Sequence, residues 1–266
     1  MTPRQLEAAR ERASGAAVEA GELLRRAALD LASLRVEEKA PGDVASRADR
    51  DAEALLRARL LEVDPHIGFV GEEGGGRSDA GAPHWLVDPL DGSMNFVRGY
   101  PAWAVSIALV VDGEPVVGVV HDPCRGETIS ASSGGGVRLE GGSAASPRPP
   151  RSLSQAVVGT VFPKPGSPRL PQYLAEFARV VSAAGGVRRS GAMALELAWL
   201  ATGRLDAFWE HDMAPWDAAA GVLLLREAGV RCVARDGQPW SGSRSLAAAT
   251  PALLDDFVTL LDGATA

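Results

Sequence analysis

The spacing of apolar residues along the chain alternates between a helical and a strand-like period. Between residues 3 and 34, apolar positions recur every three or four residues, which predicts an amphipathic helix with a small-residue face. Pro, Gly and charged residues at 39–43 interrupt this pattern, and a second helix is predicted over 46–61. Apolar runs at 67–70 and 85–88 predict short strands, the second of them buried.

A hairpin and a linker candidate follow. Two β-rich runs, 103–111 and 115–120, are joined by an Asp-Gly turn, and a further strand interrupted by glycines is expected over 126–139. Residues 141–152, rich in Gly, Ser, Pro and Arg, form the best linker candidate. Beyond it, strands are predicted at 157–162, 205–209 and 230–234, and helices at 170–184, 193–201, 218–228 and 251–261.

This order of elements predicts a mixed α/β (α+β) fold in two unequal halves. We expect an α+β half over residues 1–145 and an α/β half over 146–266, with helices covering sheets. The chain shows no internal repeat.

Composition narrows the functional classes. The 266 residues are 46% hydrophobic and 23% charged, and the net charge of −7 argues against a nucleic-acid surface. The negative net charge does not exclude an anionic substrate, because bound metal ions invert the local sign of charge. Cys124 and Cys232 are too few for a disulfide framework, which indicates a reducing compartment. The polar N-terminus lacks a secretory signal, and the apolar run at 102–111 is too short for a membrane span, so a cytoplasmic location is expected.

Two carboxylates stand at the end of the predicted buried strand at 85–88. Asp88 and Asp91 flank Pro89, which has no N–H and is expected to end strand pairing there. Asp is also common in turns, but here an apolar strand leads directly into both residues. Because buried carboxylates repel each other, a hard divalent cation such as Mg²⁺ is the simplest means of stabilising the pair.

Other acidic residues have ordinary structural interpretations when each is taken alone. Asp217 precedes an Ala-rich segment, where Asp is a favoured helix N-cap. Ser46 and Asp49 have the spacing of a capping box. Glu72 and its neighbour Glu73 would most often lie in a solvated loop.

Three segments together resemble the inositol monophosphatase family. The run Val87-Asp-Pro-Leu-Asp-Gly-Ser-Met-Asn-Phe96 is similar to the family's first signature, and Trp216-Asp-Ala-Ala-Ala-Gly221 to its second. Gly71-Glu-Glu73 resembles the family's metal-binding glutamate segment, and the similarity spans about residues 5 to 260. The resemblance overrides the ordinary interpretations of these acids. It implies the layered α-β-α-β-α sandwich of the sugar phosphatases.

The resemblance implies a cluster of two or three Mg²⁺ ions. Glu72, Asp88 and the backbone carbonyl of Leu90 would hold the first ion, and Asp88, Asp91 and Asp217 the second. A weaker third ion would lie near Glu72. The first half of the chain would therefore contribute most ligands, and the second half Asp217 and the substrate contacts.

The resemblance also implies catalytic and substrate-binding residues. Asp49 would hydrogen-bond the hydroxyl of Ser93, which replaces the family's Thr, and with Glu72 this pair would activate water. Gly92 allows close backbone approach, and a helix starting at Ser93 would point N–H groups at phosphate. Lys39 matches a family Lys near the site. Substrate contacts are implied for Gly92, Ser93, Ala192, Glu210 and Asp217.

The implied activity is Mg²⁺-dependent, lithium-sensitive hydrolysis of a small phosphate monoester in a homodimer. Inositol-1-phosphate is favoured as substrate. Histidinol phosphate, fructose-1,6-bisphosphate and adenosine 3′,5′-bisphosphate are alternatives, as is a non-enzymatic regulatory role in binding a partner protein. Glu210 suits a polyol or an amine, and His211 could approach the same end of the substrate. Arg188 and Arg189 could bind a second phosphate or form a solvated face.

Overall fold

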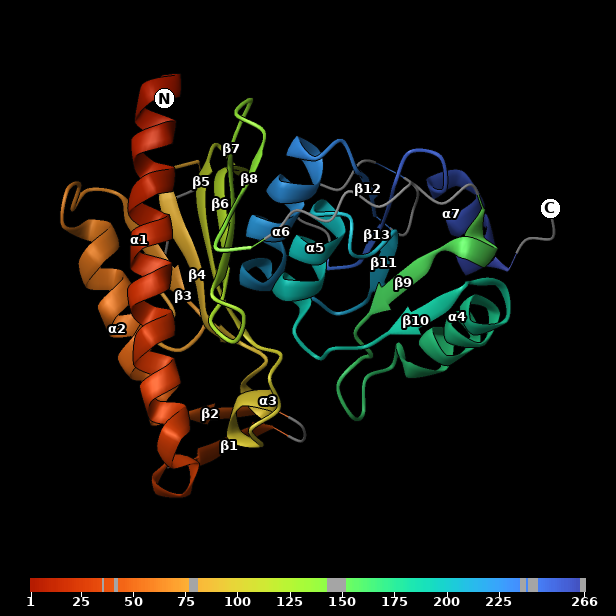
Figure 1. Ribbon diagram of the computed structural model, residues 1–266, viewed down its shortest axis with the longest axis horizontal. Helices are drawn as coiled ribbons and strands as arrows, with labels where there is room; N and C mark the ends of the chain where they lie inside the picture. The colour runs from red at the N-terminus through yellow and green to blue at the C-terminus, as the bar shows by residue number, and fades with distance from the viewer. Residues whose placement is uncertain are drawn as a thin grey trace.

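Helices and sheets alternate in layers in the computed structural model, which describes residues 1–34, 36–40, 43–76, 81–142, 152–234, 238 and 244–263 (Figure 1). The outer layer is formed by α1 (Pro3–Ala27) and α2 (Arg47–Leu61). Next come a first sheet, the helices α5 (Met193–Ala201) and α6 (Pro215–Glu227), a second sheet, and the helices α4 (Leu170–Ala183) and α7 (Leu254–Asp262). The predicted α-β-α-β-α sandwich is confirmed.

The first sheet contains the predicted hairpin and the predicted buried strand. Its strands, in order across the sheet, are β3 (Gly68–Gly71), β4 (His84–Asp91), β5 (Ala104–Val111), β6 (Glu114–Asp122), β7 (Glu127–Ser132) and β8 (Val137–Glu140). The β3–β4 pair is parallel and the other pairs are antiparallel. The glycine interruption expected within 126–139 is the turn between β7 and β8.

The prediction that Pro89 ends strand pairing is wrong. Strand β4 pairs with β5 up to Asp88, which lies opposite Ser106, and pairing resumes at Asp91, opposite Ala104. The register shifts between the two aspartates, so a β-bulge takes the proline out of the ladder, where its missing N–H is not needed. The bulge keeps both aspartates on one continuous strand.

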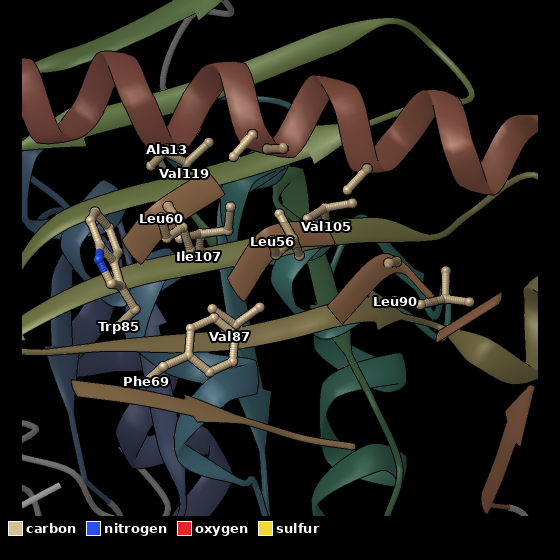
Figure 2. Packing of buried hydrophobic residues seen from close by; sticks show 14 of the residues in the cluster. Ala13, Leu56, Leu60, Phe69, Trp85, Val87, Leu90, Val105, Ile107 and Val119 are labelled. Carbon is tan, nitrogen blue, oxygen red and sulfur yellow. The ribbon is translucent and has the colours of Figure 1, made fainter. Parts of the chain in front are cut away.

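Strand β4 is buried on both faces by different helices. Trp85 and Val87 belong to a core with α1 and α2, while Leu86 packs with residues of α5 and α6. Figure 2 shows the first of these cores, with Leu56 and Leu60 of α2 above β4 and Leu90 near the end of that strand. Burial on both faces explains the unbroken apolar run, and it holds the end of β4 in a fixed position.

The second sheet includes strands that the sequence pattern did not predict. In order across the sheet it contains β10 (Gly186–Arg188), β9 (Val157–Thr160), β11 (Ala207–Glu210), β13 (Leu246–Ala249) and β12 (Arg231–Val233). Strand β10 is only three residues long, and β13 is rich in alanine, which has low strand propensity, so neither was predicted. Both gain their stability from neighbouring strands.

The long N-terminal helix ends earlier than predicted. After α1, the chain forms a 3₁₀ helix over Ala28–Ser33 with non-helical dihedral angles at Asp30, then a hairpin of β1 (Val36–Ala40) and β2 (Asp43–Ser46) where only a break was expected. The remaining short elements are α3 (Ser93–Val97) and a 3₁₀ helix at Leu153–Gln155.

Two predictions from the sequence stay open after the fold is known. Most of the expected linker, residues 143–151, lies outside the described residues. The division at residue 145 stays a prediction, and α5 and α6 pack against both sheets. No helix in the described segments is long and apolar enough to cross a membrane.

Candidate metal centre and substrate cavity

A cavity of about 410 Å³ brings together residues that are far apart in the sequence. All five predicted metal ligands line it: Glu72, Asp88, Leu90, Asp91 and Asp217. Of the predicted catalytic and substrate residues, Gly92, Ser93 and Glu210 also line it. Asp49 and Ala192 are buried outside the lining, Asp49 behind Ser93 and Ala192 against Gly92.

The aspartates of β4 are buried and close to other carboxylates. Burial, followed by the charge of Glu72, raises the pKa of Asp88 well above its usual value. Burial, followed by the charge of Asp217, does the same to the pKa of Asp91. Burial disfavours the charged form of each group, and neighbouring negative charges add to that penalty. A bound cation would remove both penalties at once.

Asp91 is held by the first turn of α5. The backbone N–H of Met193 donates to Asp91 Oδ1 at 3.2 Å, and that of Ala194 donates to Oδ2 at 2.7 Å. A helix N-terminus offers free N–H groups and a favourable dipole to an anion. These hydrogen bonds tie the end of β4 to the second half of the chain, and sequence reasoning did not predict them.

The predicted bond between Ser93 and Asp49 is present. Ser93 Oγ lies 2.9 Å from Asp49 Oδ1 and 2.9 Å from the carbonyl oxygen of Leu90. The other carboxylate oxygen of Asp49 accepts the backbone N–H and the hydroxyl of Ser46, which completes the predicted capping box of α2. Asp49 therefore makes two of its predicted contacts: it completes the capping box of α2, and it accepts the hydroxyl of a serine that lines the cavity.

Gly92 occupies a position that excludes other residues. Its backbone is left-handed, with φ of 90°, and a Cβ atom there would lie 2.9 Å from the carbonyl oxygen of Ala102. Helix α3 begins directly afterwards at Ser93, as predicted. Glycine at this point lets the chain turn sharply from β4 into α3 beside the cavity.

Asp217 lies inside the first turn of α6 and is not its N-cap. The helix begins at Pro215, and Asp217 Oδ2 accepts the backbone N–H of Ala214 at 2.9 Å. The expectation of a cap is therefore corrected, although the carboxylate still satisfies an N-terminal backbone donor. Proline at the first helical position needs no N–H partner, which explains the earlier start.

Glu210 contributes a buried carboxylate oxygen to the cavity. Its Oε2 has no hydrogen-bond partner among the described residues, and burial, followed by the charge of Asp217, raises its pKa well above the usual value. Nε2 of the neighbouring His211 lies 2.8 Å from Glu176 Oε2 of α4. That ring nitrogen is therefore committed to α4, whereas the Glu210 oxygen remains available to a ligand.

Sequence reasoning missed several lining residues. Asn95 donates from Nδ2 to the carbonyl oxygens of Ala102, at 2.6 Å, and Ser190, at 2.8 Å, and so joins the two halves of the chain. Its place in the first signature was a signal that could have identified it. Lys164 and Phe162 also line the cavity, but no motif marks them.

The two arginines considered for a second phosphate separate in the structure. Arg189 lines the 410 Å³ cavity and lies 3.8 Å above the ring of Phe162. Arg188 is not part of the lining of that cavity, but it lines a neighbouring space of about 270 Å³, which Arg189 shares. The side chain of Lys39, predicted to lie near the site, is outside the described part of the structure.

The donor set fits a hard divalent cation. The acidic side chains that line the cavity supply carboxylate oxygens, and oxygen ligands are those that Mg²⁺ prefers. In the described residues, no three His, Cys, Asp or Glu side chains already converge on a common point. The buried, unpartnered oxygen of Glu210 is a further polar atom available to a bound group.

Comparisons with known proteins give the same assignment over nearly the whole chain. An inositol monophosphatase family profile matches residues 5–263. The inositol-1-monophosphatase of Rhizobium meliloti (strain 1021) is 43% identical over 220 residues, 80% of each chain. The Nus factor SuhB of Pseudomonas aeruginosa is 42% identical over 220 residues, again 80% of each chain. The extragenic suppressor protein suhB of Bartonella henselae has a TM-score of 0.87 at 35% identity, covering 94% of this chain and 97% of that one. The chain belongs to the inositol monophosphatase family.

Proposed function

We propose that this protein is a Mg²⁺-dependent phosphomonoesterase whose favoured substrate is myo-inositol-1-phosphate. The observation that carries the proposal is that Glu72, Asp88, Asp91 and Asp217 line a single cavity, which Ser93 also lines. Relatives named inositol-1-monophosphatase support the substrate class.

The proposed ligands are those implied by the signatures. Glu72, Asp88 and the carbonyl of Leu90 would hold one Mg²⁺, and Asp88, Asp91 and Asp217 a second, with a third near Glu72. Bound Mg²⁺ would supply positive charge to the phosphate and to the leaving alkoxide. The chain's own part is to hold these oxygens in position before substrate arrives, as the N–H groups of Met193 and Ala194 do for Asp91.

Ser93 is the proposed orienting group for the attacking water. Its single hydroxyl proton is directed to Asp49 or to the carbonyl oxygen of Leu90, so its lone pairs remain free to accept a hydrogen bond. A water that donates one hydrogen bond to Ser93 keeps a lone pair for attack on the phosphate. Glu72 is the candidate acceptor for the proton that this water releases. No covalent intermediate with the protein is required.

Glu210 is the proposed contact for the alcohol part of the substrate. Its unpartnered Oε2 accepts hydrogen bonds from polyol hydroxyls and equally attracts an ammonium group, which keeps histidinol phosphate as the main alternative. Arg189, at the same cavity, is suited to a second phosphate, as in fructose-1,6-bisphosphate or adenosine 3′,5′-bisphosphate.

A substrate panel tests this proposal. Phosphate release with Mg²⁺ would be measured for inositol-1-phosphate, histidinol phosphate, fructose-1,6-bisphosphate and adenosine 3′,5′-bisphosphate, with and without Li⁺. We expect the highest kcat/KM for inositol-1-phosphate, and inhibition by Li⁺. A preference above about tenfold for another substrate, equivalent to about 1.4 kcal/mol in barrier height, would replace the favoured substrate. Absence of turnover on all four would overturn the proposal.

A second candidate function rests on relatives named Nus factor SuhB, one of them 42% identical to this chain. Their name supports a regulatory role in which the protein, proposed to be a homodimer in either case, binds a partner protein. The intact carboxylate set favours catalysis, and the two functions are compatible. Calorimetry with Mg²⁺ separates them, because absence of binding at millimolar metal would favour the regulatory role alone.

A further inference from the structure

Helix α2 presents a second buried acid one turn after Asp49. Glu53 is 5% exposed, and its position four residues along the helix places it on the same face as Asp49. Asp49 reaches the hydroxyl of Ser93, as described above. Glu53 reaches a different segment of the site, the loop that follows β3 and contains Glu72.

Both oxygens of Glu53 accept backbone N–H groups of that loop. The N–H of Glu73 donates to Oε2 at 2.8 Å, and the N–H of Gly74 donates to Oε1 at 2.8 Å. These are the two residues directly after Glu72. On the other side, the N–H of Glu72 itself donates to the carbonyl oxygen of Val87 in β4 at 3.1 Å. The backbone of Glu72 is thus held from both sides.

At two positions of this loop, an added side chain would displace the Glu53 carboxylate. A Cβ atom at Gly71 would overlap Glu53 Oε2, and one at Gly74 would lie 2.5 Å from Oε1. Neither glycine has a positive φ, so the close approach to Glu53 explains their lack of a side chain better than backbone conformation does. The loop backbone therefore packs directly against the Glu53 carboxylate.

We propose that Glu53 is a positioning residue that holds Glu72 in place for metal binding. The inference rests on the proposed function, since it takes Glu72 to be a ligand. A carboxylate is suited to this task because it accepts two N–H bonds at once. Glutamine at the same position has one acceptor oxygen and an NH₂ group, so one of the two loop N–H groups would face another donor.

The protein contains a matched control for this interaction. Glu227, near the end of α6, also accepts two backbone N–H groups of a glycine turn, those of Gly134 at 2.8 Å and Gly136 at 2.9 Å. It is ten residues beyond Asp217 on the same helix, which corresponds to about 15 Å along the axis. Glu53→Gln and Glu227→Gln therefore break the same kind of contact, near to and far from the cavity.

The test compares direct Mn²⁺ binding, measured by electron paramagnetic resonance, for the full-length protein and both variants. Mutation of a residue that orients a metal ligand typically lowers metal affinity by about 10- to 100-fold. We expect Mn²⁺ affinity to fall at least about tenfold in Glu53→Gln and to stay unchanged in Glu227→Gln. In Glu53→Gln, raising the Mg²⁺ concentration should restore kcat.

Three results would overturn the inference: unchanged Mn²⁺ affinity in Glu53→Gln, an equal loss in both variants, or a kcat that added Mg²⁺ does not restore. Absence of Mn²⁺ binding by the wild-type protein would instead count against the proposed function. If Glu53→Gln does not fold, Gly74→Ala takes its place, because its methyl group would push against the Glu53 carboxylate. Gly15→Ala is the control for this variant, since no atom lies within 4 Å of a Cβ placed at Gly15. A tenfold loss of Mn²⁺ affinity is expected for Gly74→Ala and not for Gly15→Ala.

Discussion

Two parts of the cavity are built in different ways. The acidic cluster of Asp88, Asp91 and Asp217 lies at the ends of buried elements, and a backbone N–H donates to each of these carboxylates. The outer rim of Phe162, Lys164 and Arg189 is exposed. Binding and catalytic groups need fixed geometry, whereas a rim that contacts the variable part of a substrate can change without disturbing the core. The difference explains why the sequence identifies the chemistry more readily than the substrate.

The strongest test of this contrast is Asp91→Asn in the acidic cluster. Asparagine keeps the volume of aspartate but removes its charge and turns an NH₂ group toward the N–H groups of α5. We expect kcat to fall by about 100-fold or more, because loss of a ligand should exceed the effect of losing a residue that only orients one, with the circular dichroism spectrum unchanged. Full phosphatase activity in a folded variant would contradict the assignment of Asp91 as a ligand.

The next test concerns Glu196, which is buried behind the rim. Its carboxylate accepts the backbone N–H of Ser190, and burial raises its pKa from the ordinary value of 4.5 to about 7. An acid whose pKa is higher in the folded state than in the unfolded state binds more protons when folded. The contribution of Glu196 to stability is therefore fully present below pH 4.5 and is lost as pH rises through about 7.

The Glu196→Gln variant isolates this contribution. Between pH 4.5 and about pH 7, the wild-type protein should lose about 3 kcal/mol of unfolding free energy that the variant retains, because each pKa unit corresponds to about 1.4 kcal/mol. Urea unfolding at several pH values measures the difference. Parallel pH profiles for the two proteins would show that Glu196 titrates normally.

The smallest expected effect is that of Asn95→Ala, which breaks one of the links between the two halves of the chain. Its amide bonds two carbonyl oxygens, and each hydrogen bond contributes about 0.5–1.5 kcal/mol, so a loss of about 1–3 kcal/mol in unfolding free energy is expected. Because Ser190 lies beside the cavity-lining residues Arg189 and Gly191, KM should rise more than kcat falls. An unchanged KM would mean that this link does not position the substrate side.

Part of this architecture could be predicted from local patterns. The apolar run before Asp88 correctly predicted a buried strand, and Ser46 with Asp49 correctly predicted a helix cap. Strand β13 could not be predicted, since its alanine-rich sequence has no strand preference of its own. Pro89 led to a wrong prediction because a β-bulge, invisible in the sequence, accommodates it.

The sequence by itself identified the family and the candidate acidic residues. Asp88 and Asp91 lie next to Gly92 and Ser93 in the chain, so together they form a motif that can be recognised without the structure. Tertiary structure alone decided how those residues are held: Asp91 by the start of α5, about a hundred positions away, and the Glu72 loop by Glu53. It also decided that Arg189 lines the cavity while Arg188 does not. Such contacts depend on packing between distant elements, and no local spacing records them.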